Sequence, residues 1–397
     1  MISKIISKTK FEKEENCFEV ELENTIFRPQ GGGQPGDQGK LIKKDNSDQE
    51  FLIVNTFKKD NKIIHILKTD KQDSLNINDE VELIVNTDLK DELAKLHSAE
   101  HILFQSIKRI DEDAVVEKVN IHAQESSLFV KSPNLNIDKI IEAEKLANNI
   151  ISENRNINIH EITKEEVPNY KLLRIKLEKI KDDKIRVVEI ENFDQSACCG
   201  SHVKNTSEIG FLVISKINFI GKGTYEIRYK LNDLSLLFDL ANTSRKARSI
   251  LNVDSDQIIA NITNLKTANE NFKEKIRELS KLVNIEIKKE KLNNELNFWY
   301  AVFPGINKRD FIQKINEIEE NNCIVCFINH DEIENKTSIA IRIINPASET
   351  DASQILNTVT ESFNGKGGGN NLLAQGNIEI EKGESLDQVF KFIKQIL

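Results

Sequence analysis

The sequence predicts an α+β protein of several domains, and three observations support this prediction. Its 397 residues exceed what one hydrophobic core usually holds. The composition, with 39% hydrophobic and 30% charged residues, is typical of a globular protein. The spacing of apolar residues changes several times between the alternation of strands and the three-to-four-residue period of helices. We therefore expect four regions, at residues 1–90, 91–233, 234–296 and 297–397.

The composition also excludes several classes of protein. No run of about 18 apolar residues occurs, so we expect neither a transmembrane helix nor a membrane partner. Five cysteines are an odd number in a long chain, which favours a reducing, cytoplasmic location over a disulfide scaffold. The net charge of −9 excludes a uniformly basic nucleic-acid-binding surface but permits a local basic groove.

Residues 1–90 are expected to form strands, because short apolar runs such as 18–22, 51–54 and 63–67 lie between polar turns. One stretch breaks this pattern. Residues 28–36, with the sequence RPQGGGQPG, suit neither a strand centre nor a helix. We expect a loop whose backbone comes close to another group; the alternative is a simple tight turn.

Residues 91–233 are expected to form an α+β domain. Leu93, Leu96, Leu103 and Ile107 make an apolar stripe that predicts a helix over 88–108. A second helix is predicted at 137–153, and strands at 185–190, 209–217 and 224–231.

Residues 254–296 contain a heptad pattern, with steps of four and three residues. A polar residue in the seam, Asn269, could define the register. The pattern predicts a helical hairpin or coiled coil; the alternative is an ordinary long helix packed on its own domain. The seam residues are Ile258, Ile262, Leu265, Asn269, Phe272, Ile276, Leu279 and Val283.

The last hundred residues are expected to form a separate α/β domain. Strands are predicted at 323–328 and 338–344, a helix at 351–363, and a second glycine loop at 365–370 before a final strand and helix. Cys323 and Cys326 form a CxxC inside an apolar run without a second pair, so core packing is favoured over a metal site.

Two pairs of residues predict a metal site. His97 and His101 lie four residues apart on a predicted helix, so both imidazoles face one side. Cys198 and His202 repeat this spacing. Three imidazoles and one thiolate suit tetrahedral Zn²⁺. The alternative is core histidines with buried thiols, but the chain has only 7 His and 5 Cys, and four of them fall into these pairs.

These motifs resemble those of a known family. HSAEH at 97–101 and CCGSH at 198–202 resemble the HxxxH and CxxxH pairs of the alanyl-tRNA synthetase editing domain. NTIFRPQGGGQPGD at 24–37 is similar to the glycine-rich loop of the small β-domain that precedes it. GKGGG at 365–369 and AQG at 374–376 resemble the signature of the DHHA1-type C-terminal domain.

The resemblance implies a free-standing alanyl-tRNA editing protein of the long AlaX type, because the chain starts at the β-domain. It implies a small N-terminal β-barrel at 1–90, a zinc-containing α+β editing domain at 91–233, a helical hairpin or coiled coil at 234–296, and a DHHA1-type α/β domain at 297–397. It also implies that the C-terminal domain helps to hold the tRNA and forms a homodimer.

The implied activity is hydrolysis of the ester that joins serine, and in some members glycine, to tRNA(Ala). An alanine pocket rejects these amino acids poorly, so a second site must remove the errors. The resemblance assigns recognition of the serine hydroxyl to Thr25; the alternative is an ordinary strand residue. Gln34 and the backbone amides of Gly31, Gly32 and Gly33 are candidate donors to the ester.

Several points stay open in the sequence. Four protein ligands close a tetrahedral site, so zinc either polarises the ester and activates water or mainly positions the substrate. Glu100 is a candidate base, although a solvated carboxylate or one that supports a ligand is favoured. Cys199 stands where synthetases usually have glycine, and spacing favours Cys198 as the ligand. Basic residues at 171–186 and 216–230 could line a groove for the acceptor stem.

Other functions fit part of the pattern. A non-catalytic tRNA-binding module with a structural zinc shares every motif. A phosphoesterase is disfavoured, because the Asp-His-His triplet that accompanies DHHA1-type domains in such enzymes is absent from the sequence. Editing of a threonine tRNA uses related motifs, but the glycine loop and C-terminal domain favour alanine.

Overall fold

The protein is described by a computed structural model that covers residues 1–397, except residues 13, 46–48, 70–74, 171–172, 176–182, 283–284, 293–295, 346–349 and 381–384. The chain forms two compact units, Met1–Arg245 and Lys246–Leu397. A helix long and apolar enough to cross a membrane does not occur among the described residues.

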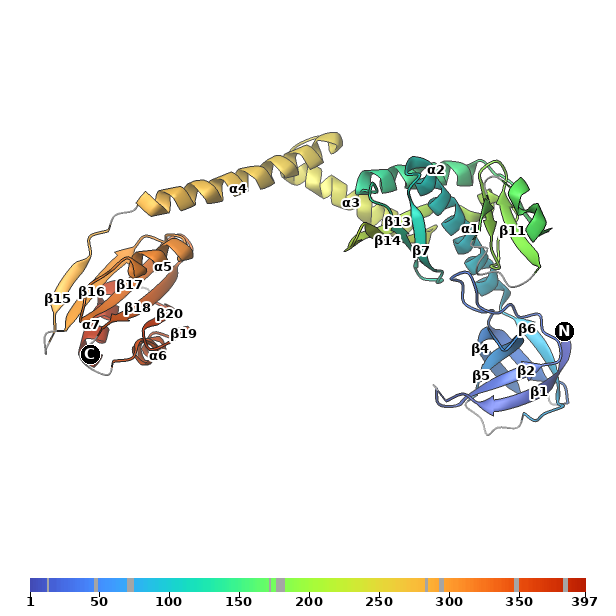
Figure 1. Ribbon diagram of the computed structural model, residues 1–397, viewed down its shortest axis with the longest axis horizontal. Helices are drawn as coiled ribbons and strands as arrows, with labels where there is room; N and C mark the ends of the chain where they lie inside the picture. Colours follow the sequence, from blue (N-terminus) through green and yellow to red (C-terminus); the bar gives the residue numbers. More distant parts are fainter. Residues whose placement is uncertain are drawn as a thin grey trace. The chain divides into compact units, whose positions relative to one another are not determined.

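The first unit begins with a closed antiparallel barrel (Figure 1). The strand order is β1-β2-β5-β4-β3-β6, and β6 pairs back to β1. Alternate residues such as Val20, Leu41 and Val81 fill its interior, as the alternating sequence pattern predicts. The strands are β1 (Ile2–Lys10), β2 (Cys17–Leu22), β3 (Gly39–Lys43), β4 (Glu50–Lys59), β5 (Lys62–Lys68) and β6 (Glu80–Val85).

The rest of the first unit is an α+β region built around α1 (Thr87–Ile110), which packs against α2 (Ile137–Ser152). The side chain of Asn86 caps α1 by accepting from Leu89 N. Two four-stranded sheets, β10-β12-β11-β9 and β13-β14-β8-β7, share one core with the helices. Their strands are β7 (Val115–Asn120), β8 (Ser126–Lys131), β9 (Ile157–Thr163), β10 (Leu173–Arg174), β11 (Lys184–Ile190), β12 (Asp194–Ala197), β13 (Leu212–Gly221) and β14 (Thr224–Leu231).

Both predicted helices of this region are confirmed, and one strand boundary is wrong. The strand predicted at 209–217 begins at Leu212. A short 3-10 helix, Thr206–Ile209, occupies the preceding residues. Gly210 ends it with a φ of 85°, a left-handed conformation outside the β region, so the strand begins only after this glycine.

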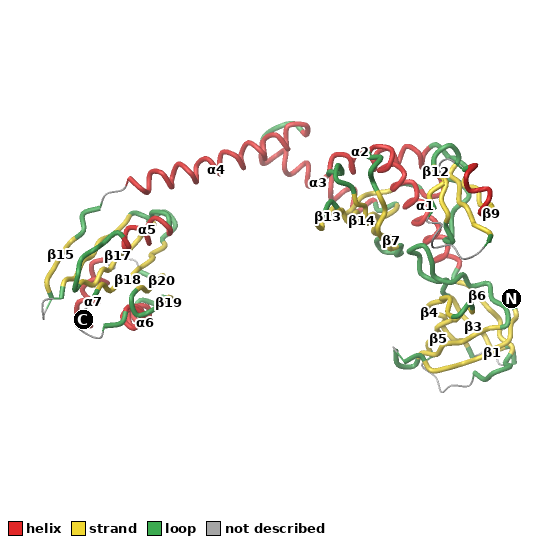
Figure 2. The backbone as a smooth tube through the Cα atoms, viewed as in Figure 1, coloured by secondary structure: helices red, strands yellow, loops and turns green. Residues whose placement is uncertain are grey.

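The second unit contains a six-stranded mixed sheet between two helical layers (Figures 1 and 2). On β17, Ile324, Cys326 and Ile328 share a core with α6 and α7, whereas Val325 and Phe327 share one with α5. The sheet order is β15-β16-β17-β18-β20-β19. Its elements are β15 (Lys288–Lys291), β16 (Asn297–Phe303), α5 (Lys308–Asn316), β17 (Cys323–Asp331), β18 (Lys336–Ile344), α6 (Ala352–Ser362), β19 (Lys366–Gly369), β20 (Leu373–Ile378) and α7 (Leu386–Ile396).

Two predictions for this unit have different outcomes. Cys323 and Cys326 are both buried in the core, as predicted. They belong to the cores on opposite faces of the sheet, so they cannot ligate one ion. The glycine loop predicted at 365–370 is wrong, because Lys366–Gly369 forms the edge strand β19 paired with β20.

Helices α3 (Leu234–Leu251) and α4 (Ile258–Leu282) follow the α+β region, and the division between the units falls within α3. The heptad residues from Ile258 to Leu279 lie on α4, whereas Val283 lies outside the described residues. Ile262, Leu265 and Phe272 are exposed rather than packed in a seam. The four-domain division stays a prediction.

Candidate metal centre

Four predicted ligands converge on one point. His97, His101, Cys198 and His202 place one ligand atom each within 4.8 Å of all the others. The Cys198 sulfur lies 3.5 Å from His97 Nε2 and 3.4 Å from His202 Nε2. These separations match neighbouring vertices of a tetrahedron with metal–ligand bonds of about 2.0–2.3 Å. The cluster therefore has the composition and size of a metal site.

Each imidazole is oriented by a second residue. His97 Nδ1 donates to Gln34 Oε1 at 2.8 Å. The Ser98 hydroxyl donates its proton to the Ala94 carbonyl. Ser98 Oγ can therefore only accept from His202 Nδ1, which lies 3.1 Å away. Since the Nδ1 atoms of His97 and His202 are used in this way, their Nε2 atoms face the Cys198 sulfur, which is the arrangement that metal-binding histidines usually have.

The third imidazole faces a carboxylate that sequence reasoning missed. His101 Nδ1 lies 3.4 Å from Asp194 Oδ2, at the start of β12. Arg174 donates to both oxygens of Asp194, at 2.8 and 2.7 Å. Burial raises the pKa of Asp194, but Arg174 and His101 outweigh it and lower that pKa to about 2. Asp194 therefore stays ionised beside His101.

The electrostatics favour a thiolate at Cys198. Burial raises the pKa of this thiol, but hydrogen bonds from the three imidazoles outweigh burial and lower the pKa well below its ordinary value. A thiolate is the form that binds metal. Cys199 next to it is exposed and lies outside the cluster, so the thiol that the structure offers to a metal is that of Cys198, the one that the spacing favours.

The glycine-rich loop lies against this cluster. Gly31 and Gln34 bond to each other through their backbones, and the turn between them gives Gly32 and Gly33 φ values of 62° and 80°. A Cβ on Gly32 would lie 3.4 Å from the His97 ring and 3.7 Å from the Cys198 sulfur. The loop therefore brings backbone to the cluster, as the sequence predicted.

Two residues hold this loop in place. Arg28 donates to the carbonyls of Pro29 and Pro35, at 2.8 and 2.5 Å, and so closes the base of the loop. Lys90 of α1 pairs with the buried Asp37 at 2.8 Å. These contacts connect the barrel to the helix that carries His97 and His101.

The side-chain amide nitrogen of Gln34 is free to donate to a ligand. Its Oε1 accepts from His97 Nδ1 and, at 2.9 Å, from Ser201 N, which identifies it as the oxygen. Its Nε2 is buried without a hydrogen-bond partner. A buried amide donor without a partner costs about 1–3 kcal/mol, unless a ligand satisfies it.

Gly200 allows the second ligand pair to approach. A Cβ there would collide with the His97 ring. The glycine between Cys198 and His202 is therefore required by close packing of the two ligand pairs.

Thr25 has two partners inside the barrel. Its hydroxyl lies 2.8 Å from His65 Nε2, and Phe27 N donates to it at 3.1 Å.

Glu100 is not solvated, so that part of the prediction is wrong. It is only 4% exposed, and its Oε2 lies 3.8 Å from His101 Nε2. Its place one residue before His101 on a buried helix brings it to the edge of the cluster.

The predicted basic groove at 171–186 is only partly described. Lys171, Lys176, Lys179 and Lys181 lie outside the described residues. Arg174 binds Asp194, and Arg186 donates to the Cys198 carbonyl. Both arginines therefore support the metal centre rather than a groove for RNA.

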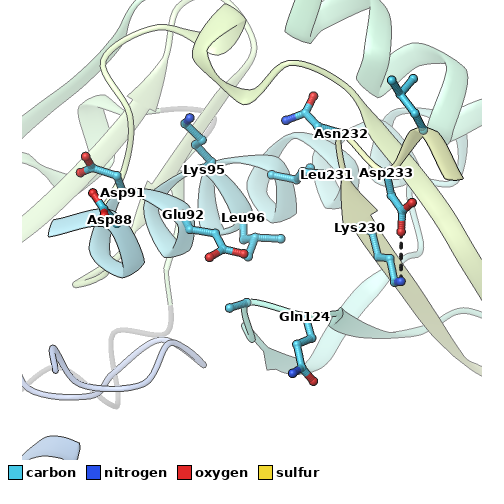
Figure 3. Close-up of a pocket in the computed structure, with 12 residues that line it drawn as sticks. Asp88, Asp91, Glu92, Lys95, Leu96, Gln124, Lys230, Leu231, Asn232 and Asp233 are labelled. Carbon is cyan, nitrogen blue, oxygen red and sulfur yellow. Dashed lines mark hydrogen bonds and ion pairs between the residues drawn. The ribbon is translucent and has the colours of Figure 1, made fainter. Parts of the chain in front are cut away.

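A polar pocket of about 690 Å³ lies between the first turns of α1 and the end of β14, as Figure 3 shows. Asp88, Asp91 and Glu92 line it from the helix, whereas Lys230 is paired with Asp233 at 3.1 Å. Acidic groups outnumber basic groups in this lining, so the pocket does not suit RNA phosphates.

Comparisons with known proteins agree with this geometry. The family described as threonyl and alanyl tRNA synthetase second additional domain matches residues 185–227. The chain is 30% identical over 220 residues to the alanyl-tRNA editing protein AlaX-M of Methanosarcina mazei, covering 54% of this chain and 87% of that protein. It is 26% identical over 406 residues to AlaX-L of Pyrococcus horikoshii, covering 97% and 94%.

A second kind of relative is much longer. The alanine–tRNA ligase of Buchnera aphidicola is 28% identical over 369 residues, which are 90% of this chain but 41% of the ligase. The chain thus spans less than half the length of this ligase, whereas it covers most of the editing proteins. The chain belongs to the family of alanyl-tRNA editing proteins.

Proposed function

We propose that this chain is a trans-editing hydrolase that removes serine, and to a lesser extent glycine, from mischarged tRNA(Ala). The observation that carries the proposal is a cluster of three imidazoles and one thiolate beneath a glycine loop that holds an unpartnered amide donor. The names of the AlaX relatives support the substrate class. On this proposal the protein acts in the cytoplasm.

Zn²⁺ is the ion that the donor set suits best, because borderline-soft zinc accepts both imidazole and thiolate. His97, His101, Cys198 and His202 would hold it, with Gln34, Ser98 and Asp194 fixing the rings. When bound, zinc supplies positive charge that polarises the ester or a water molecule.

The chain's own groups then orient the substrate. Gln34 Nε2 donates to the ester carbonyl, where negative charge develops during attack. The backbone amides of Gly32 and Gly33 are further candidate donors, whereas the Gly31 amide already donates to the Gln34 carbonyl. Thr25 recognises the serine hydroxyl, and alanine, which lacks this group, is spared.

A second candidate function is a non-catalytic tRNA-binding module with a structural zinc. The observation that favours it is the closed donor set, since four protein ligands are typical of structural zinc sites. The two candidate functions differ in one respect: the hydrolase cleaves the aminoacyl ester, whereas the binding module does not.

A deacylation assay on Ser-tRNA(Ala), Gly-tRNA(Ala) and Ala-tRNA(Ala), coupled to metal analysis, separates these functions. We expect turnover of the serine ester by the metal-loaded full chain and its loss in His97→Ala. His330→Ala, which removes a histidine from the second unit, is the matched control. Binding of tRNA without turnover would support the structural module instead.

Gln34→Glu isolates the role of the amide donor. The glutamate keeps an oxygen for His97 and Ser201 but has no Nε2 donor. We expect the metal content to stay unchanged while the rate falls by roughly 100-fold, as for loss of one donor to an oxyanion. A rate equal to that of the unmodified chain would remove Gln34 from the mechanism.

The chain is also proposed to form a homodimer through its C-terminal domain, residues 297–397, with the preceding helix α4 as a further contact. The exposed heptad residues of α4, among them Ile262, Leu265 and Phe272, support this proposal, because such a stripe is stable when a second helix covers it. Sedimentation of the unmodified chain and of Phe272→Glu tests it; a monomer in both cases contradicts it.

A further inference from the structure

His65 is a buried histidine whose two ring nitrogens both have partners. It lies on β5, is 0% exposed, and its ring packs edge-on against Phe27 at a centroid distance of 5.6 Å. Nδ1 lies 3.2 Å from the Val20 carbonyl, and Nε2 lies 2.8 Å from the Thr25 hydroxyl. Its partner Thr25 is the residue proposed above to recognise serine.

The partners determine which nitrogen carries the proton. A backbone carbonyl only accepts hydrogen bonds, so Nδ1 must be the protonated nitrogen. Burial lowers the pKa of His65 to about 4, against a weaker effect of the Val20 carbonyl, so the ring is neutral at physiological pH. Nε2 therefore presents a lone pair, and the Thr25 hydroxyl must donate its proton to it.

This arrangement leaves the Thr25 hydroxyl with acceptor capacity only. Its single proton goes to His65, and one lone pair accepts from Phe27 N at 3.1 Å. Only the second lone pair of the Thr25 oxygen remains, and it can bind only a group that donates a hydrogen bond.

We propose that His65 is a positioning residue that fixes Thr25 as a hydrogen-bond acceptor, so that the site selects aminoacyl esters whose side chain carries a donor. The proposal rests on the proposed function and deepens it: serine, with its hydroxyl, is preferred over glycine and alanine, neither of which satisfies the Thr25 lone pair. A discrimination of this kind follows from the cost of leaving a polar group unpaired.

A simpler role for His65 is to support the glycine loop. His65 pairs across the sheet with Thr56, whose carbonyl accepts from Gln30 N and whose hydroxyl donates to the Asp37 carbonyl. Loss of His65 could thus act through the loop. That role would change turnover of every ester alike, whereas the positioning role changes the ratio between esters.

Nitrogen NMR of the full chain with ¹⁵N-labelled histidine tests the hydrogen-bond polarity without a variant or an activity. The His65 ring is assigned through its contacts with the Phe27 ring. We expect a neutral ring with the proton on Nδ1 at neutral pH. A proton on Nε2, or a charged imidazolium, would overturn the proposal.

The ratio of hydrolysis rates between the serine and glycine esters tests whether His65 controls the selectivity. We expect His65→Leu to lower the ratio of serine to glycine hydrolysis by about 10-fold, the effect of one hydrogen bond. Thr25→Val should have the same effect, and the double variant should add little. His65→Gln, which can place an oxygen near the Nε2 position, should restore part of the ratio.

His330→Leu is the matched control, because it removes another histidine–threonine contact, that of His330 Nδ1 with Thr337 Oγ1 at 2.9 Å in the second unit. In this control the ratio of serine to glycine hydrolysis should stay unchanged.

A ratio that responds to Thr25→Val but not to His65→Leu would overturn the proposal and leave the proposed function intact. An unmodified chain with no turnover of any ester would instead overturn the proposed function, while the NMR result would still decide the polarity. If His65→Leu fails to fold, Thr25→Val and the NMR result decide.

Discussion

Two segments of three consecutive glycines occur in this chain, and they adopt different structures. Residues 31–33 form a turn with left-handed φ values at Gly32 and Gly33. Residues 367–369 lie in the extended edge strand β19 and pair with residues 374–376 of β20. Three glycines in a row therefore do not specify one conformation.

The reason lies in what each segment touches. A Cβ on Gly33 would lie 2.5 Å from the Val119 carbonyl, and one on Gly32 would approach His97. In the strand, a Cβ on Gly369 would collide with backbone of β20, whereas one on Gly368 would meet nothing. The first segment needs glycine for its dihedral angles and its contact with the metal centre, the second for close approach of two strands.

The largest expected effect comes from removing the cluster that the first segment faces. Cys198→Ser should weaken metal binding by roughly 1000-fold, about 4 kcal/mol, because the change removes the negatively charged thiolate from the cluster. A competition titration against a chromophoric chelator measures this. Cys199→Ser, at the exposed neighbouring thiol, is the control and should bind like the unmodified chain. Equal affinities in both variants would contradict the ligand assignment.

The next effect compares the glycines directly. Gly33→Ala should lower the free energy of unfolding by about 3 kcal/mol, because a Cβ at φ 80° is strained and must displace the Val119 carbonyl. Gly368→Ala has open space and should leave this free energy unchanged or raise it by up to about 1 kcal/mol. Urea unfolding measures both. Similar losses would mean that the two segments are equivalent.

The stability of the barrel that supports the first segment should also depend on pH. The pKa of His65 is about 4 in the folded protein, below its ordinary value of 6.5, so the unfolded chain binds more protons between these values. The His65 contribution to stability is therefore present above about pH 6.5 and is lost as the pH falls towards 4. From pH 7 to pH 5 the loss is about 2 kcal/mol. The difference in this loss between the unmodified chain and His65→Leu isolates it; identical pH dependences would contradict the buried neutral ring.

The smallest effect is expected inside the loop itself. A Cβ on Gly31 would meet nothing within 4 Å, and Gly31 is not among the residues with positive φ. Gly31→Ala should therefore change the free energy of unfolding by less than about 0.5 kcal/mol. A large loss would show that the whole triplet, rather than Gly32 and Gly33, is required.

Much of the fold could be predicted because it follows from local patterns. The alternation of apolar residues located several strands, such as β2, β11 and β18, but missed others, such as β8 and β9; the three-to-four spacing located α1 and α2 to within two residues. The strand at 366–369 could not be predicted, because its glycines carry no apolar pattern and its conformation depends on pairing with β20. The exposure of the α4 stripe was equally hidden, since the heptad spacing does not specify a partner.

By itself the sequence identified the four residues of the cluster as candidate metal ligands, because residues four apart on a helix face one side whatever the rest of the chain does, and the second pair repeats this spacing. Only the tertiary structure decided which residues orient them. Gln34 and Asp194 lie 63 and 93 positions from the histidines that they hold, and Ser98 lies 104 positions from His202. Polar side chains of this kind are common along the chain, and folding alone selects the few that meet a ring nitrogen.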